Sequence, residues 1–221
     1  MDYENEFEKE IFYAINMLRW NPKSFVPHVQ RVHTKGLNKL PDGKQSRQMP
    51  KLIELLKTVN PCSTVKFDDG CNAAVRNNNV DLCGENAVEK PEAGGNLDMY
   101  RELQQSQDPK GFEYSFFKYE GNSAEEFVAL LLYQDFDRQD IEKAKQEAPK
   151  DGEQASAPPS EDAQAASQEP AAAKVEAADE EVKPGLLDES VTSVGISNKA
   201  HAKCTNSIQV ILLCSSVNQM M

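Results

Sequence analysis

The side chains that most often carry metal or acid–base chemistry are few and scattered in this sequence. The three histidines are His28, His33 and His201. A transition-metal site needs three or four nitrogen, sulfur or oxygen donors that converge. His28 and His33 are five positions apart in one predicted helix and so lie on different faces, while His201 stands alone in a polar turn. The sequence therefore predicts neither a metal site nor a cofactor.

Two acidic motifs invite a functional interpretation. A Gly-Glu-Asn sequence at 84–86 supplies Glu85, and Asp135, Asp137 and Asp140 follow one another closely. A calcium-binding EF-hand loop needs glycine at its sixth position, where counting from Asp135 places Asp140. We interpret Glu85 as part of a polar turn, and the aspartates as the end of a helix that runs into an acidic linker.

Nucleophilic catalysis has no recognisable motif in this chain. The sequence contains neither a Gly-x-Ser-x-Gly elbow nor a glycine loop that cradles phosphate. Ser115 lies among aromatic residues and has no histidine beside it. We predict no catalytic residue and a protein that is not an enzyme. The open alternative is a hydrolase in which Asp137 or Glu85 is the general base and Ser115 the nucleophile.

Composition excludes two classes of protein. The net charge of the 221-residue chain is −12, with 36 acidic and 24 basic side chains, so nucleic-acid binding has no electrostatic support. No apolar run approaches the roughly 18–20 residues that span a bilayer. The 9 phenylalanines, 6 tyrosines and 1 tryptophan all lie between Tyr3 and Phe136, which indicates an uneven distribution of core-forming residues.

The cysteines and the first residues bear on the cellular compartment. Five cysteines without a Cys-x-x-Cys pair favour reduced, buried thiols. The chain begins with acidic residues and shows neither the basic nor the apolar region of a signal peptide. We therefore expect a cytoplasmic protein; the alternative is an extracellular one whose N-terminus has been trimmed.

Hydrophobic periodicity predicts the elements that must position these side chains. Asn5 is the expected N-cap of the first helix, and Ser123 with Glu126 forms a capping box before another. The expected helices cover 5–19, 22–32, 48–58, 71–82, 97–105 and a segment that starts at 123, and the expected strands cover 65–67, 112–119, 191–197 and 207–214, with a polar turn over 198–206.

Residues 142–185 differ in character from the rest of the chain. They contain 11 acidic and 5 basic side chains, no aromatic residue and few branched aliphatic ones. Such a composition buries too little apolar surface to order a chain, so we predict a disordered acidic insert. One domain is then made of 1–141 plus 186–221. The insert is either a solvated spacer or an arm that recruits a protein partner, a basic one if charge decides.

Four stretches, in order, resemble the SCP domain of the CAP superfamily, which groups cysteine-rich secretory, antigen-5 and pathogenesis-related proteins. Asn16, Arg19 and Pro22 match its "N-x-x-R-x-x-P" helix. The other similar stretches are 52–57 with 65–74, 121–128 through 138–141, and the pair 194–197 and 208–213. The resemblance implies an α+β fold, a three-layer α–β–α sandwich with a small antiparallel sheet, here interrupted by the insert.

The same resemblance implies where a metal-binding cleft would lie. Its two histidines and two acids correspond to Asn77, Ser115, Gln134 (with Asp135 beside it) and Asp137, so neither histidine is present. Glu85, Asp135 and His201 are alternative members of the cleft. We therefore expect a degenerate SCP domain that acts as a non-catalytic binding or scaffold module. Some relatives bind lipid or sterol, which is a further alternative.

Overall fold

The computed structural model describes residues 3–39, 43–84, 95–105, 109–121, 123–147, 184–201 and 203–215. Of these, the side chains of 139–147, 204 and 205 are not described. The elements in chain order are α1 (Glu6–Trp20), η1 (Pro22–Phe25), α2 (Val26–Thr34), α3 (Met49–Thr58), β1 (Lys66–Phe67), α4 (Asp69–Gly84), α5 (Asn96–Gln104), β2 (Gly111–Phe117), α6 (Ala124–Glu147), η2 (Gly185–Leu187), β3 (Val191–His201) and β4 (Cys204–Cys214).

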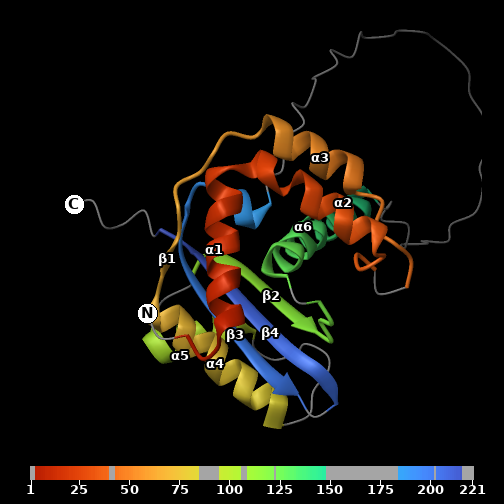
Figure 1. Cartoon of the computed structure of the whole chain (residues 1–221). Coiled ribbons are helices and arrows are strands. Elements are labelled where there is room, and N and C mark those ends of the chain that lie inside the picture. Colours follow the sequence, from red (N-terminus) through yellow and green to blue (C-terminus); the bar gives the residue numbers. More distant parts are fainter. Residues whose placement is uncertain are drawn as a thin grey trace, which may run out of the picture.

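The described chain forms three layers around a four-stranded sheet of order β1-β3-β4-β2 (Figure 1). Helices α1, α2, α3 and α6 build the larger core on one face, and α4 with α5 covers the other. Residues alternate between the faces along β4, so that Val210 and Leu212 enter the larger core while Ile211 and Leu213 enter the smaller one. The expected α+β class and layer order are confirmed.

The sheet is antiparallel except at one edge. β4 pairs antiparallel with both β2 and β3, whereas the two-residue β1 pairs parallel with β3. No hairpin connects β1 to β3, because the chain passes from β1 directly into α4, so turn geometry does not fix their relative direction. The expected antiparallel sheet is therefore a mixed one at this edge.

The predicted helix caps Asn5 and Ser123 are present, but the capping box predicted at 123–126 is only half formed, because the Glu126 carboxylate bonds to Lys35 instead of the Ser123 N–H. The side-chain oxygen of Asn5 accepts a hydrogen bond from the backbone N–H of Glu8 (3.0 Å), and Ser123 Oγ accepts one from Glu126 N–H (3.3 Å). The Glu8 carboxylate also accepts from the N–H of Glu4 and from that of Asn198, each at 2.8 Å. A local cap thus joins α1 to the distant strand β3.

Two predicted boundaries are wrong. The polar turn expected at 198–206 is mostly strand, since Asn198 pairs with Ile208 and Lys199 with Ser207 across the hairpin. Polar residues continue these strands because α1 and α4 provide hydrogen-bond partners for them. At the other boundary, α6 runs to Glu147, past the start of the predicted insert, because the Lys, Ala, Gln and Glu residues there favour helix. Gly185 is buried in η2, and 148–183 lie outside the described residues.

A buried arginine joins α1 to two distant segments of the chain. Arg19 is completely buried, and its guanidinium donates to four backbone carbonyls. Nε donates to Ser63 (2.7 Å), Nη1 to Leu186 (2.9 Å) and Asp188 (3.0 Å), and Nη2 to Val191 (3.1 Å). The five N–H groups of a guanidinium form a rigid fork, which suits a ring of carbonyls that come from different directions.

We expect Arg19→Met to lower the free energy of unfolding by at least about 3 kcal/mol, because four buried carbonyls lose their donors while the apolar stem is kept. The control is Arg101→Met, which removes a half-exposed ion pair with Asp98 (2.7 Å) and should cost no more than about 1 kcal/mol. Urea unfolding followed by far-ultraviolet circular dichroism measures both. Equal losses would contradict the assigned role of Arg19.

Candidate functional site

The positions implied by the SCP resemblance do not gather in one place. Asn77 lies on the exposed side of α4, and Ser115 on β2 faces the α4–α5 layer. Gln134 and Asp137 lie on α6, across the sheet from both. Glu85 lies outside the described residues. No single centre could therefore use the four implied positions together.

Most of these side chains have partners within the fold. Ser115 Oγ donates to Gln209 Oε1 (2.6 Å), and Asp137 Oδ1 accepts from Ser46 Oγ (2.8 Å). Nδ1 of His201 accepts a hydrogen bond from the backbone N–H of Lys203 (3.1 Å), which closes the β3–β4 turn. The buried Oε1 of Gln134 accepts no hydrogen bond from the described residues. The contacts of Ser115, Asp137 and His201 therefore connect parts of the fold to one another.

Asp135 is a buried carboxyl with a perturbed pKa. Tyr114 Oη donates to its Oδ2 at 2.8 Å, and the N–H groups of Gly185 and Leu186 also bond to it. Burial raises the pKa of Asp135 from the ordinary 3.8 to about 6, against the opposite effect of these hydrogen bonds and of Arg138. A carboxyl that titrates near neutrality is a candidate acid or base. Here, however, both Asp135 (5% exposed) and Tyr114 (1%) are closed inside the core.

The Asp135 contacts instead fix where the chain re-enters the fold. Gly185 and Leu186 belong to η2, the short helix that leads into the last two strands. The guanidinium of Arg138 lies 5.5 Å from the centre of the Tyr114 ring and donates to the carbonyl of Glu113 (3.2 Å). One carboxyl therefore couples α6, β2 and η2. Asp135 is a candidate from the sequence but Tyr114 is not, because their pairing depends on the packing of α6 on the sheet.

A polar layer lies between the sheet and helices α4 and α5. Asn79 is completely buried, and its amide donates to Ser207 O (3.0 Å) and Ser197 Oγ (3.1 Å). Asn78 donates to Asn96 (2.7 Å), which in turn donates to the same Gln209 oxygen that Ser115 contacts (3.3 Å). These asparagines, glutamine and serines do not titrate near neutral pH, so the layer positions elements but offers no acid–base group. The run of three asparagines at 77–79, which is unusual in a helix, is the feature of the sequence that could have indicated this buried polar layer.

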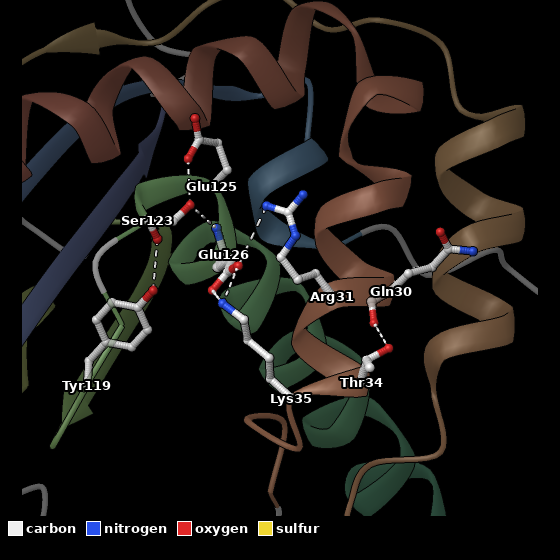
Figure 2. A network of polar contacts seen from close by, with 8 residues as sticks. All are labelled: Gln30, Arg31, Thr34, Lys35, Tyr119, Ser123, Glu125 and Glu126. Atoms are coloured by element: carbon white, nitrogen blue, oxygen red, sulfur yellow. Dashed lines mark hydrogen bonds and ion pairs between the residues drawn. The ribbon is translucent and has the colours of Figure 1, made fainter.

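A second polar joint connects α2 to α6 (Figure 2). The buried carboxylate of Glu126 has both oxygens 2.8 Å from Lys35 Nζ and one oxygen 3.7 Å from Arg31. Beside it, Ser123 Oγ donates to Glu125 (2.7 Å), which lowers the pKa of that carboxyl, and Tyr119 Oη donates to the carbonyl of Ser123 (2.8 Å). The polar groups of these residues thus bond to one another, while Thr34 Oγ1 donates separately to the carbonyl of Gln30 within α2 (2.9 Å; Figure 2).

Neither a metal cluster nor a membrane span is found in the described part of the chain. Within those ranges no group of three or more His, Cys, Asp or Glu side chains could hold a metal ion. Among the described helices, none combines the length and the apolar character needed to cross a bilayer.

The outer face of α1 exposes three large apolar side chains in a row. Tyr13 is 58% exposed, Met17 37% and Trp20 72%, and their spacing of four and three residues places them on one side of the helix. The opposite side of α1 is fully buried in the larger core. We call this set of three residues the α1 outer face. Hydrophobic periodicity predicts the buried stripe of this helix but not the exposed one, which becomes evident only in the packed fold.

Comparisons with protein-family models, with curated proteins and with solved structures find no match for this chain. Membership of the CAP superfamily therefore stays a prediction, which rests on the sequence stretches described above.

Two asparagines on α4, the buried Asn79 and the exposed Asn77, should differ in how much they contribute to stability. Asn79→Ala should lower the free energy of unfolding by about 2–3 kcal/mol, because the carbonyl of Ser207 and the hydroxyl of Ser197 lose a buried donor. Asn77→Ala, on the exposed side of the same helix, should change it by no more than about 0.5 kcal/mol. Urea titration of both variants checks this. A loss of free energy of unfolding with Asn77→Ala as large as that with Asn79→Ala would contradict the exposed, non-structural position of Asn77.

Asp135 should make stability depend on pH. The pKa is raised in the fold, so the stability that the protonated carboxyl contributes is complete below its ordinary value of 3.8 and is lost as pH rises through about 6. Asp135→Asn cannot ionise. Its free energy of unfolding, relative to that of the natural chain, should therefore rise by up to about 3 kcal/mol from pH 4 to pH 7.

Urea unfolding at a series of pH values measures this difference. Other titrating groups, such as Glu8, whose pKa burial raises, are common to both proteins and cancel in the comparison. Parallel pH profiles for Asp135→Asn and the natural chain would show that the Asp135 carboxyl does not titrate in this window.

Proposed function

We propose that this chain is a non-catalytic protein-binding module and that the α1 outer face is its contact surface. The observation that carries the proposal is the exposure of Tyr13, Met17 and Trp20 along one side of a helix whose other side is fully buried. Trp20 is the sole tryptophan of the chain and the most exposed of its large apolar side chains in the described ranges. Exposed apolar side chains in a contiguous row are typical of interaction sites.

The chemistry of this face suits a protein partner. Tryptophan and tyrosine are the residues most enriched among those that dominate binding energy at protein interfaces. Both bury a large apolar area and keep a polar tip that can donate a hydrogen bond. An exposed helix side with anchors at these spacings is also the pattern by which helices dock into grooves or onto other helices.

The face is held rigid before any partner arrives. α1 is capped by Asn5 at its start and is tied near its end by Arg19 to four carbonyls. A partner that binds such a helix does not need to order it, and this lowers the entropic cost of association. Rigidity thus supports α1 as the contact element.

The polar interior supports the non-catalytic part of the proposal. Ser115 and Asp137, the pair a hydrolase would use, lie on opposite faces of the sheet and bond to Gln209 and Ser46 respectively. Asp135 is closed in the core with Tyr114. No specific observation favours the hydrolase or the lipid- or sterol-binding alternative among the described residues.

The remaining sequence-based expectations belong to the same proposal. A degenerate SCP domain is the family origin that we propose, and its implied layer order agrees with this fold. The cytoplasm is the compartment in which we place the partner. A basic partner for the acidic insert predicted over 142–185 is not part of this argument, because 148–183 lie outside the described residues.

Photo-crosslinking tests the contact surface directly. The photoreactive residue p-benzoylphenylalanine replaces Tyr13 in the full chain, and irradiation in the cells of origin should give a discrete product of higher mass. The matched control places the same residue at Leu103, which is 42% exposed on α5, in the opposite layer. It should give no such product.

A third sample ties the product to the proposed face. Trp20→Ala combined with the photoreactive residue at position 13 should remove the product, because an anchor of the face is lost while the fold, which barely contacts this side chain, is kept. The proposal fails if no product forms at position 13. It also fails if Leu103 gives the same product.

A further inference from the structure

We infer that the outward surface of η1, α2 and α3 is a second binding site, one that takes an Asp- and Glu-rich segment of a partner protein. We call its exposed cations the basic face, and they are Lys23, Arg31, Lys35, Lys39, Lys44, Arg47, Lys51 and Lys57. None of them belongs to the α1 outer face, so this inference goes beyond the proposed function and does not rest on it.

The charge of the chain is distributed very unevenly along the sequence. Residues 21–58 contain 8 of the 24 basic side chains but only Asp42 and Glu54 of the 36 acidic ones, which gives this segment a formal charge of +6. The rest of the chain therefore carries −18, for a total of −12. A local positive region on a strongly negative molecule attracts an acidic partner to one place and orients it there.

The basic residues belong to elements that pack on one another. η1 contacts both α2 and α3, and α2 contacts α3. The two helices lie at one end of the molecule, with α4 and α5 at the other (Figure 1). All eight basic side chains are exposed, whereas apolar residues of the same elements, such as Phe25, Val29 and Leu52, are buried in the larger core. The basic face is therefore the outward side of one packed unit.

The connection between α2 and α3 holds two of these cations on a fixed backbone. Asn38 (4% exposed) and Ser46 (1%) are buried, and the N–H of Ser46 donates to the carbonyl of Asn38 at 2.8 Å. Ser46 Oγ also donates to Asp137 on α6 at 2.8 Å. Lys39 and Arg47 each follow one of the two buried residues directly. Their backbone is therefore held in place before a partner arrives, which lowers the entropic cost of binding.

Part of the positive charge has no carboxylate partner in the described part of the chain. In those ranges, the members of the basic face that form no ion pair are Lys23, Lys39, Arg47 and Lys57. The first turn of α3 contains Lys51 and no acidic residue, although an acidic side chain is the one that stabilises the start of a helix. Like charges that gather in this way destabilise the fold, and an acidic segment bound to them would offset the repulsion.

The types of cation favour carboxylates over a single phosphate group. Six of the eight are lysines, which present point charges on flexible stems, while a phosphate is typically held by the rigid fork of arginine. In an extended acidic segment the residues follow one another at about 3.3 Å, so carboxylates recur along its length. A set of lysines spread over two helices and their connection can contact several of them at once.

The surroundings of these cations disfavour two other anionic partners. In the described ranges, the exposed large apolar side chains lie on α1, α4 and α5 and none lies on η1, α2 or α3. The basic face therefore offers no exposed aromatic ring on which nucleic-acid bases could stack, and no apolar side chain that could enter a membrane. The charge of −18 on the rest of the chain also repels a long nucleic acid.

Fluorescence anisotropy with an acidic peptide tests the site on the full chain. The probe is a labelled peptide of about 20 residues in which Glu alternates with Ser, and its neutral control has Gln in place of Glu. The Glu peptide should bind with a micromolar dissociation constant at about 50 mM salt and more weakly at about 300 mM, because the contacts are exposed ion pairs. The Gln peptide should not bind.

Charge reversal locates the site on the molecule. Lys39→Glu combined with Arg47→Glu should raise the dissociation constant at least about tenfold, because two attractive contacts become repulsive. The matched control is Lys199→Glu combined with Lys203→Glu, which makes the same change in net charge at two exposed positions of β3 and the turn after it. The control should change the dissociation constant by no more than about twofold, since distant charges are screened.

A measurement on the natural chain does not depend on the folding of any variant. Lysines are acetylated with and without the Glu peptide, and the modified positions are identified by mass spectrometry. The peptide should protect Lys39 and Lys57 of the basic face and leave Lys199 on β3 as reactive as before.

Three results in these experiments would overturn the inference. They are no binding of the Glu peptide, an equal loss of affinity in the two double variants, and equal protection of Lys39 and Lys199. Phosphatidylcholine vesicles that contain phosphatidylserine, and single-stranded RNA, are tested beside the peptide. Tighter binding of either one than of the peptide would also overturn the inference. So would a basic face already protected without peptide, because acidic residues of the same chain would then occupy it.

Discussion

The fold depends first on the convergence of four carbonyl groups on the guanidinium of Arg19. One carbonyl comes from the segment before β1, and the other three come from η2 and the start of β3. These regions are more than a hundred residues apart in the sequence, and β1 and β3 pair in parallel beside this point. The rigid guanidinium at the end of α1, with its several donors, therefore holds the segment before β1 next to η2 and the start of β3.

Polar contacts on both faces of the sheet complete this alignment. Asp135 and Tyr114 join α6 to β2 on one face, and Asn79 joins α4 to the β3–β4 hairpin on the other. A buried polar group costs free energy unless it is hydrogen-bonded. Each of these pairs therefore stabilises the observed packing register, and any shifted register would leave its polar groups unpaired. The same bonding occupies the groups that could otherwise do chemistry. The interior contacts specify the fold, while Tyr13, Met17 and Trp20 on α1 take no part in them and stay exposed.

Local signals in the sequence predicted local structure well. Asn5 and Ser123 are helix caps, and the amphipathic stripe of 5–19 is α1, because these features act within one or two turns. The strand extension through Asn198 was missed because its support comes from Glu8, far away in the sequence. The raised pKa of Asp135 likewise depends on its burial in the packed core, which only the fold shows. The exposed residues of α1 are visible in the sequence, but only the packed fold shows which stripe of the helix is left uncovered.

The exposure of Trp20 determines what an optical experiment on this protein observes. A single indole that is 72% exposed should fluoresce in the native state much as it does in the denatured chain. The emission spectrum of Trp20 should then change little during global denaturation. It should change instead when a molecule binds at the end of α1. Soluble quenchers such as acrylamide should reach this ring freely in the isolated chain, so a change in quenching reports occupancy of the surface rather than loss of the fold.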